Sequence, residues 1–242
     1  MNGNTSAKQQ MTPKVKRGVV SWIVKAVGGL VFFALLLFLS AGRWDWVWGW
    51  VFLCLFLIAS IVNVLILIPT NPALLADRSR GIREGTKTWD KWITSFAAGL
   101  LPMASWVIAA LDVRNEWSPH VALALHVGGG VFFALGWAVL LWATASNAFF
   151  STTVRIQDER GHTVQTGGPY RFVRHPGYVG AIVYQFATPF LLGSWWALIP
   201  MVVSVPLYVL RAALEDRTLQ EELVGYEEYA QRVRYRLLPG IW

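Results

Sequence analysis

Long apolar stretches constrain this chain of 242 residues more than any other feature. Four runs of about 20 or more mostly apolar residues cover 18–39, 46–68, 92–111 and 119–145, and a fifth run covers 178–211. A helix of ~20 apolar residues is long enough to cross the hydrocarbon core of a bilayer. Only 14% of the residues are charged, against about 25% in an average soluble domain. The sequence therefore predicts an all-α, polytopic integral membrane protein.

The last apolar run is too long for one membrane span, because a span needs only ~20 residues. Gly193 and Ser194 interrupt it, and the tryptophans that follow suit a membrane interface. We therefore expect two short spans joined as a tight helical hairpin, which gives about six transmembrane helices in all. We also expect Pro102 to kink the third span.

Two further packing features are predicted outside the hairpin. In the fourth span, small residues recur every four positions at Gly130, Ala134 and Ala138, which predicts a stripe where another helix approaches closely. Residues 73–80 lie between the second and third spans and are expected to form a short interfacial helix.

The chain divides into three parts. Residues 1–17 are polar and basic without apolar periodicity, so we expect a disordered basic tail. A cleaved signal peptide is disfavoured, because the apolar run that follows exceeds the 7–15 residues of a signal sequence. Residues 18–129 then hold the N-terminal transmembrane helices, and residues 130–242 hold a core with the motifs described below.

Basic residues lie almost entirely on one side of the predicted spans. Of 21 Lys and Arg residues, eighteen fall in the N-terminal tail, the link after the second span, the link after the fourth span and the segment from residue 211 onward. Arg43 and Arg114 fall on the other side, and Lys25 lies inside the first span. The positive-inside rule therefore predicts that both termini and the link after the fourth span are cytoplasmic.

Composition also argues against several kinds of partner. The single cysteine, Cys54, permits no disulfide within the chain and no thiolate metal site. The basic residues follow the links between spans and are not interleaved with aromatic residues, so we expect no nucleic-acid partner. We expect no bound metal, because no second His or Cys lies close enough to His175 to complete a zinc site.

One polar link carries the most distinctive motif, at residues 167–180. It reads Gly-Gly-Pro-Tyr-Arg-Phe-Val-Arg-His-Pro-Gly-Tyr-Val-Gly. We interpret this stiff, basic segment as one wall of a cofactor pocket. The alternative is a rigid turn that enters a helix at Pro176, with Arg171 and Arg174 facing lipid phosphates.

A second polar cluster follows the hairpin and begins at Arg211, with Glu215 and Asp216 one turn later. Because a hairpin returns the chain to the side it left, the two clusters should be neighbours. Arg211 and Glu215 share one helix face, and a carboxylate at membrane depth is costly unless it is paired. A purely structural Arg211–Glu215 pair that ends the span is the alternative interpretation.

Together these motifs resemble the isoprenylcysteine carboxyl methyltransferase family, which lies within the broader phospholipid methyltransferase group. The resemblance rests on residues 168–180, Arg211-x-x-x-Glu-Asp, Gly225-Tyr-Glu-Glu-Tyr and the final Leu-Leu-Pro-Gly-Ile-Trp. It is strong over 130–242 and weaker upstream, where Asn71-Pro-Ala-Leu-Leu and Trp89-Asp90-Lys91 are similar to bacterial members. Sterol and steroid reductases carry a similar Arg-His-Pro-x-Tyr element, so an NADPH-dependent membrane reductase is one alternative. A phospholipid N-methyltransferase is another.

The resemblance implies that residues 130–242 are a methyltransferase core that binds S-adenosyl-L-methionine at the cytoplasmic face of a bacterial inner membrane. It implies cofactor contacts at Gly168, Pro169, Tyr170, Arg174, His175, Pro176, Tyr178, Gly180, Glu215 and Asp216. Asp216 stands where the family usually has a second Glu. Arg211 would orient a lipophilic or small-molecule acceptor at the bilayer, and Glu215 would act as base if that acceptor is an amine.

Overall fold

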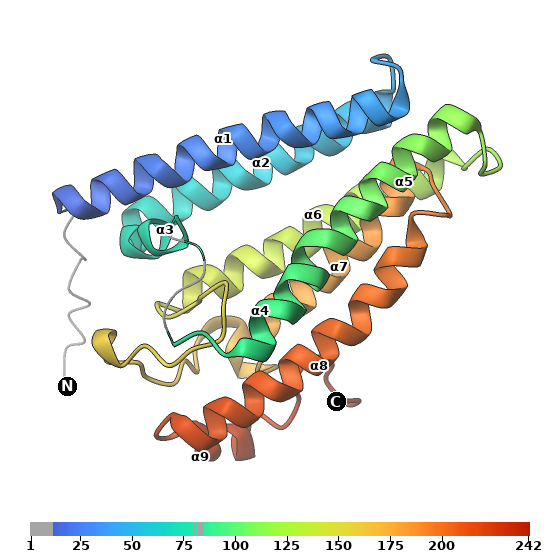
Figure 1. Cartoon of the computed structure of the whole chain (residues 1–242). Coiled ribbons are helices and arrows are strands. Elements are labelled where there is room, and N and C mark those ends of the chain that lie inside the picture. The colour runs from blue at the N-terminus through green and yellow to red at the C-terminus, as the bar shows by residue number, and fades with distance from the viewer. Residues whose placement is uncertain (1–11, 80, 82–84) are drawn as a thin grey trace.

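The computed structural model describes residues 12–79, 81 and 85–242. These residues form a bundle of long helices that run roughly along one direction (Figure 1), and they contain no β-strand. Within these described ranges, five helices are long and apolar enough to cross a membrane: α1 (Pro13–Ala41), α2 (Val47–Thr70), the continuous Thr88–Asn115 segment, α6 (Leu123–Ser146) and α8 (Leu198–Glu222). The predicted all-α, polytopic class is confirmed.

A sixth long helix, α7 (Pro176–Leu192), has 17 residues and is shorter than these five. It packs along α6 over most of its length, and α6 and α7 form the most extensive helix pair among the described residues. The total of six membrane spans stays a prediction, because α7 is shorter than the five helices that are long enough to cross a membrane.

The first helix begins earlier than the sequence indicated. α1 starts at Pro13, and the side chain of Thr12 accepts a hydrogen bond from the backbone N–H of Val15 at 3.3 Å. A threonine N-cap followed by proline at the first helical position is a favourable helix start. Residues 13–17, expected in the tail, are therefore helical, and residues 1–11 lie outside the described residues.

A short helix, α3 (Pro72–Arg78), forms near the expected position between α2 and the third span. The side-chain oxygen of Asn71 accepts a hydrogen bond from the N–H of Leu74 at 3.2 Å and caps this helix. At the other end, Lys25 Nζ of α1 donates to the carbonyl of Ser79 at 2.6 Å. A cation at a helix C-terminus is favourable, so Lys25 holds α3 against the first span.

The third span changes its helical period just before Pro102. Its parts are α4 (Thr88–Thr94), the π-helical turn η1 (Ser95–Leu100) and α5 (Leu101–Asn115). Proline has no N–H, and its ring crowds the carbonyl four residues earlier. A wider turn relieves that crowding, and Leu101 N–H bonds the carbonyl of Phe96, five residues back. The irregularity expected at Pro102 is therefore a π-helical turn.

Glycines bring α6 and α7 into close contact, although not at the predicted positions. A Cβ added to Gly136 would lie 2.5 Å from the backbone nitrogen of Tyr184, and one added to Gly180 would lie 2.6 Å from the carbonyl oxygen of Gly136. The predicted stripe is wrong, because Ala134 and Ala138 are exposed. The close approach uses Gly136 on a neighbouring face of the same helix.

The predicted hairpin is present, with α7 and α8 as its arms, and its turn begins at Gly193. This residue adopts the left-handed conformation with φ of 79° after α7, which glycine tolerates best. The buried carboxylate of Asp112 accepts hydrogen bonds from the hydroxyls of Ser118 and Ser194, and so joins the end of α5 to this turn.

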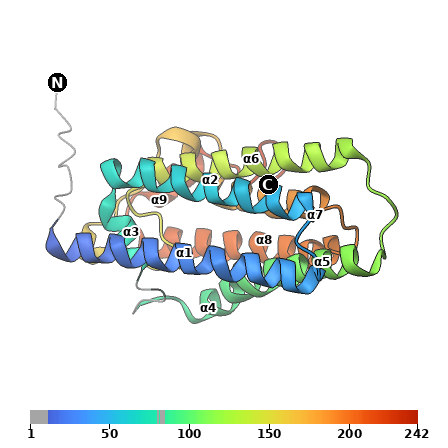
Figure 2. The same ribbon diagram turned by 90° about the horizontal axis from the view of Figure 1, so that it is seen from above.

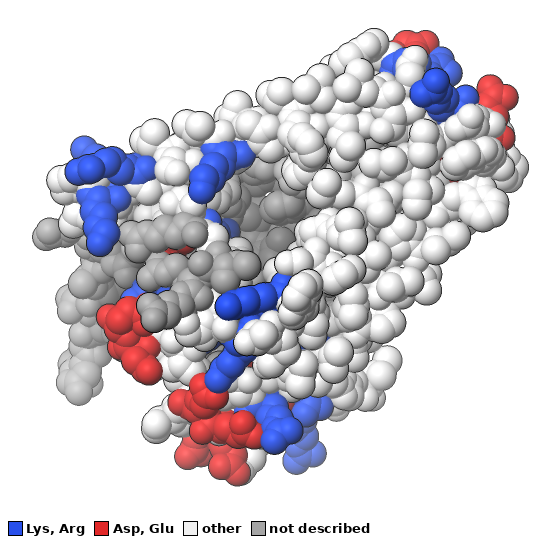
Figure 3. All heavy atoms as spheres, viewed as in Figure 1, with Lys and Arg blue, Asp and Glu red and all other residues white. Residues whose placement is uncertain are grey.

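The hairpin places the start of α7 and the end of α8 at the same end of the bundle, as the two views show (Figures 1 and 2). The short helix α9 (Tyr226–Arg232) lies at this end, and so do α3 and the start of α1. On the face seen in Figure 3, charged side chains gather at the two ends of the bundle, and a broad uncharged surface lies between them. That distribution suits a helical bundle in a bilayer.

Candidate functional site

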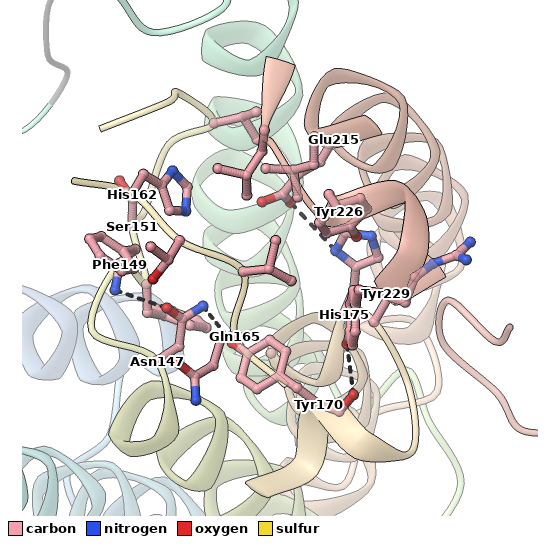
Figure 4. Close-up of a pocket in the computed structure, with 18 of the residues that line it drawn as sticks. Asn147, Phe149, Ser151, His162, Gln165, Tyr170, His175, Glu215, Tyr226 and Tyr229 are labelled. Atoms are coloured by element: carbon pink, nitrogen blue, oxygen red, sulfur yellow. Dashed lines mark hydrogen bonds and ion pairs between the residues drawn. The ribbon is translucent and has the colours of Figure 1, made fainter. Parts of the chain in front are cut away.

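A pocket opens at the polar end of the bundle (Figure 4). The space inside it, with the open solvent of its mouth included, is about 790 Å³. Four segments line it: residues 147–165, residues 170–178, the last turns of α8 and the start of α9. The two motifs singled out in the sequence, which flank the hairpin, therefore meet at one pocket.

The first motif forms a turn that is fixed by backbone hydrogen bonds. The N–H groups of Arg174 and His175 donate to the carbonyls of Tyr235 and Arg236, each at 2.9 Å. Pro176 then begins α7 at the first helical position, where a missing N–H has no cost. The C-terminal segment thus holds this turn in place, even though about 60 residues separate them in the sequence.

Tyr170 forms part of the pocket wall beside this turn. Its backbone carbonyl accepts a hydrogen bond from the hydroxyl of Tyr229 at 2.6 Å, and its own hydroxyl accepts one from Asn147 Nδ2 at 3.2 Å. Burial raises the pKa of Tyr170 well above its usual value, and burial raises the pKa of Tyr229 too. Both phenols therefore stay neutral and present aromatic surface at physiological pH.

Among the described residues that line the pocket, Glu215 is the one carboxylate. Its side chain is 24% exposed, and it accepts a hydrogen bond from the hydroxyl of Tyr178. The Nδ1 atom of His175 lies 3.8 Å from the same carboxylate oxygen. In Figure 4, Glu215 and His175 lie on one side of the pocket, opposite His162 and Phe149. Glu215 can therefore meet a cationic group of a bound molecule.

Asp216 faces away from the pocket and is fully buried. Its two oxygens hold two arginines, with Arg174 Nε at 2.8 Å and Arg236 Nε at 2.9 Å. The hydroxyl of Tyr226 donates to it at 2.9 Å, and His175 Nε2 lies at 3.4 Å. Asp216 thus joins the first motif, α9 and the C-terminal segment, and its contacts are those of a structural centre beneath the pocket.

Arg211 is also buried and points to a different partner from the one expected. Its Nε and Nη2 atoms donate to the two oxygens of Asp90 at 2.7 and 3.3 Å, and Nη2 donates to the carbonyl of Thr152 at 2.8 Å. The guanidinium carbon lies 5.0 Å from the centre of the Tyr178 ring. The alternative of an Arg211–Glu215 pair is therefore wrong, because Asp90 of α4 takes that place.

The structure divides the predicted cofactor contacts into two groups. Tyr170, Arg174, His175, Tyr178 and Glu215 line the pocket. The others lie close to it without forming its wall: Gly168, Pro169, Pro176, Gly180 and Asp216. Arg211, which was predicted to orient the acceptor, is not part of the wall either. Within this second group, Gly168 packs against the side chain of Ser146 and Gly180 packs against α6. Their contacts account for small residues at these positions without a ligand.

Sequence reasoning missed the wall formed by the link after α6. This wall includes Asn147, Phe149, Ser151, Thr153, His162 and Gln165. Nothing in the spacing of these polar residues marks them, because they lie on an irregular segment without helical or strand periodicity. Tyr226 and Tyr229 were missed too, although they belong to the Gly225-Tyr-Glu-Glu-Tyr motif that was singled out. That motif was the available signal.

His162 adds a titratable group to this wall. Its Nδ1 atom accepts a hydrogen bond from the N–H of Gln157 at 3.4 Å, and its ring lies 4.7 Å from that of Phe149. Burial lowers the pKa of His162, and the nearby charge of Arg160 lowers it further. The ring is therefore neutral at physiological pH and carries its proton on Nε2. Among the described residues, no group of three or more His, Cys, Asp or Glu side chains is arranged to hold a metal ion.

Comparisons with known proteins agree with the motifs. Residues 130–223 match the model of the isoprenylcysteine carboxyl methyltransferase (ICMT) family. Two rice proteins, from Oryza sativa subsp. indica and subsp. japonica, are each named "Probable protein-S-isoprenylcysteine O-methyltransferase" and are each 29% identical to this chain over 125 residues. The matched region covers 50% of this chain and 62% of each relative. The comparisons therefore confirm the predicted resemblance: residues 130–223 are similar to the isoprenylcysteine carboxyl methyltransferase family.

Proposed function

We propose that this chain is an integral-membrane methyltransferase that uses S-adenosyl-L-methionine and acts on a lipophilic or small-molecule acceptor. The observation that carries the proposal is the position of Glu215. Among the described residues it is the one carboxylate in a pocket otherwise lined by aromatic, aliphatic, polar and basic side chains, and it lies beside the His175 turn that the family match includes. A cationic, amphiphilic methyl donor suits such a site.

The residues of the pocket fit the parts of that donor. Glu215 can bind its amine or lie near its sulfonium by charge attraction. Tyr170 and Phe149 offer aromatic faces for an adenine ring or a cation. Arg155 also lines the pocket and supplies positive charge for its carboxylate, and the His175 ring can offer a hydrogen bond. When bound, S-adenosyl-L-methionine would supply an activated methyl group on a positively charged sulfur.

The protein's own residues have mainly to align and shield the reactants. Methyl transfer from sulfur is an in-line displacement that depends on orientation and on exclusion of water. Tyr178 fixes the carboxylate of Glu215 by a hydrogen bond, and Asp216 fixes Arg174 below the turn. Arg211 would orient the acceptor. A carboxylate acceptor needs no base, whereas an amine acceptor must first lose a proton, for which Glu215 is the nearest candidate.

We also propose that the pocket faces the cytoplasm, where the methyl donor is made. The basic links expected on the inner side surround this end of the bundle, and α3, α9 and the start of α1 lie there (Figure 1). A bacterial inner membrane is consistent with the upstream motifs. The acceptor would then meet the donor at the boundary between bilayer and cytoplasm.

Calorimetric titration of the purified, detergent-solubilised chain with S-adenosyl-L-methionine and with NADPH tests the proposal. We expect S-adenosyl-L-methionine to bind and NADPH not to bind. In a second assay, with methyl-labelled donor and a membrane extract, we expect a component of the extract to receive the label. Glu215→Ala and His175→Ala should weaken donor binding about tenfold or more, since hydrogen bonds to charged groups contribute ~1.5–3 kcal/mol. Arg211→Ala should keep donor binding and lose turnover.

The matched control is Arg217→Ala, because the Arg217 side chain is 77% exposed on the same helix. It should bind the donor as the unmodified chain does. Binding of NADPH without S-adenosyl-L-methionine would replace this proposal with a membrane reductase. Unchanged donor affinity in both the Glu215 and His175 variants would mean that the donor binds elsewhere.

A further inference from the structure

Arg211 and Glu215 lie one turn apart on α8, yet no ion pair joins their side chains in the described part of the chain. Arginine and glutamate at this spacing readily pair on a helix surface. Here the guanidinium of Arg211 is bound side-on by Asp90 at 2.7 and 3.3 Å. Glu215 instead accepts a hydrogen bond from Tyr178 and remains partly exposed in the pocket. Asp90 therefore determines which carboxylate neutralises Arg211.

Both carboxylate oxygens of Asp90 are occupied by hydrogen bonds from the protein. It is fully buried in α4, where Thr94 Oγ1 donates to its Oδ1 atom at 3.2 Å. Its Oδ2 atom accepts the backbone N–H of Val154 at 2.7 Å. Val154 belongs to the pocket wall. One carboxylate from outside residues 130–223 thus holds both Arg211 and the wall opposite the first motif.

Two further contacts keep the guanidinium of Arg211 beside Asp90. The carbonyl of Thr152 accepts a hydrogen bond from Nη2 at 2.8 Å. The ring of Tyr178 lies beside the guanidinium, with 5.0 Å from ring centre to guanidinium carbon. If Asp90 lost its charge, Arg211 would be a buried cation without a carboxylate partner, which is unfavourable. Glu215, four residues along the same helix, is the nearest carboxylate in sequence that could replace it.

We propose that Asp90 is a positioning residue that keeps Arg211 away from Glu215, so that the carboxylate of Glu215 stays free for a cationic ligand. This inference rests on the proposed function, because it takes the ligand to be a methyl donor with a positively charged amine and sulfonium. It extends the site to α4 and makes the segment before residue 130 part of ligand recognition. Asp90 acts through Arg211 and does not itself touch the ligand.

The test compares two ligands and two variants by calorimetric titration of the full chain. S-adenosyl-L-methionine carries a cationic sulfonium and amine. In 5′-methylthioadenosine the same nucleoside bears a neutral thioether and no amino-acid part. We expect Asp90→Asn to weaken binding of S-adenosyl-L-methionine about tenfold, which is ~1.4 kcal/mol. Binding of 5′-methylthioadenosine should change less than about twofold. The double variant Asp90→Asn/Arg211→Met should recover S-adenosyl-L-methionine binding, because it removes the cation that competes for Glu215.

Each other outcome overturns the inference in a distinguishable way. An unmodified chain that does not bind S-adenosyl-L-methionine overturns the proposed function and this inference with it. Normal binding of S-adenosyl-L-methionine by Asp90→Asn overturns the inference alone. Equal loss of both ligands, or no recovery in the double variant, assigns Asp90 a purely structural role. If Asp90→Asn does not fold, the double variant decides alone. The quantity compared is then the affinity for S-adenosyl-L-methionine divided by the affinity for 5′-methylthioadenosine. A value equal to that of the unmodified chain supports the inference, and a lower value overturns it.

Discussion

The hydroxyl of Tyr178 donates a hydrogen bond to the carboxylate of Glu215, although the two residues are 37 positions apart. Tyr178 lies in the first turn of α7 and Glu215 near the end of α8, so the bond joins the two arms of the hairpin. It fixes the one carboxylate that lines the pocket in the described part of the chain. Under the proposed function, the position of a bound cation would therefore depend on the hydroxyl of Tyr178.

Tyr178→Phe removes this hydrogen bond and keeps the ring beside Arg211. A hydrogen bond to a charged group contributes ~1.5–3 kcal/mol, so we expect the affinity for S-adenosyl-L-methionine to fall about tenfold. Calorimetric titration measures it. Tyr235→Phe is the matched control, because Tyr235 is exposed and is not part of the pocket wall. Equal affinity in the Tyr178 variant and the control would show that Glu215 needs no help from the phenol.

Asp216→Asn should act on stability before it acts on binding. The change leaves the guanidinium groups of Arg174 and Arg236 without their shared carboxylate, and removal of one member of a buried ion pair costs ~3–5 kcal/mol. We expect a clear fall in the thermal unfolding temperature. Glu221→Gln is the control, since Glu221 pairs with Arg217 on the exposed surface, where such pairs contribute ~0–1 kcal/mol.

The contrary result for Asp216 is equally informative. Unchanged thermal stability with a tenfold loss of donor affinity would make Asp216 a direct contact, as the family resemblance implies. The structure favours the first outcome, because the aspartate is fully buried and is not part of the pocket wall. Glu215 and Asp216 are adjacent in the sequence but point about 100° apart around the helix, so one faces the pocket and the other faces the packed interior.

The fold was largely predictable from the sequence, because apolar runs of about 20 residues leave few options other than helices across a bilayer. The hairpin followed from Gly193 and from the length of the last run. The sequence did not show which residues of neighbouring helices would face each other. Helix α6 is apolar on every face, so the sequence does not show that Gly136 rather than Ala134 meets α7.

The candidate site was predictable where a motif placed several unusual residues together. His175, Tyr178 and Glu215 belong to such motifs and line the pocket. Asp90 was not predicted as a partner of Arg211, since 121 residues separate them and only tertiary packing brings them together. Its signal was general: a carboxylate at the edge of an apolar span needs a partner. The sequence did not name that partner.

Gly180→Ala tests whether this glycine serves packing or the cofactor. A new Cβ would lie 2.6 Å from the carbonyl oxygen of Gly136, and backbone atoms cannot move aside cheaply. Overpacking of this kind costs ~1–3 kcal/mol, so we expect a lower unfolding temperature. The matched control is Gly128→Ala on α6, where nothing lies within 4 Å of the new atom. If Gly180→Ala instead kept its stability and lost donor binding, the family-derived cofactor contact would be correct.

His162 should make the stability of the pocket wall depend on pH. Burial lowers its pKa in the folded chain below the value of about 6.5 in an unfolded chain. Between those two values the unfolded state binds more protons than the folded state, so stability rises with pH. The contribution is complete above about pH 6.5 and is lost as the pH falls through the lowered pKa. The added proton would occupy Nδ1, which now accepts the Gln157 N–H.

Replacing this ring by an amide isolates its contribution. His162→Gln removes the titratable group, so we expect its unfolding temperature to vary less between pH 5 and pH 7 than that of the unmodified chain. One titrating group changes the dependence of the unfolding free energy on pH by at most about 1.4 kcal/mol per pH unit. Because only the unmodified chain loses the His162 contribution as the pH falls, the stability curves of the two chains should converge toward acidic pH. Thermal unfolding in one detergent at matched ionic strength measures both. Parallel curves over this range would show that the pKa of His162 is the same in the folded and unfolded chain.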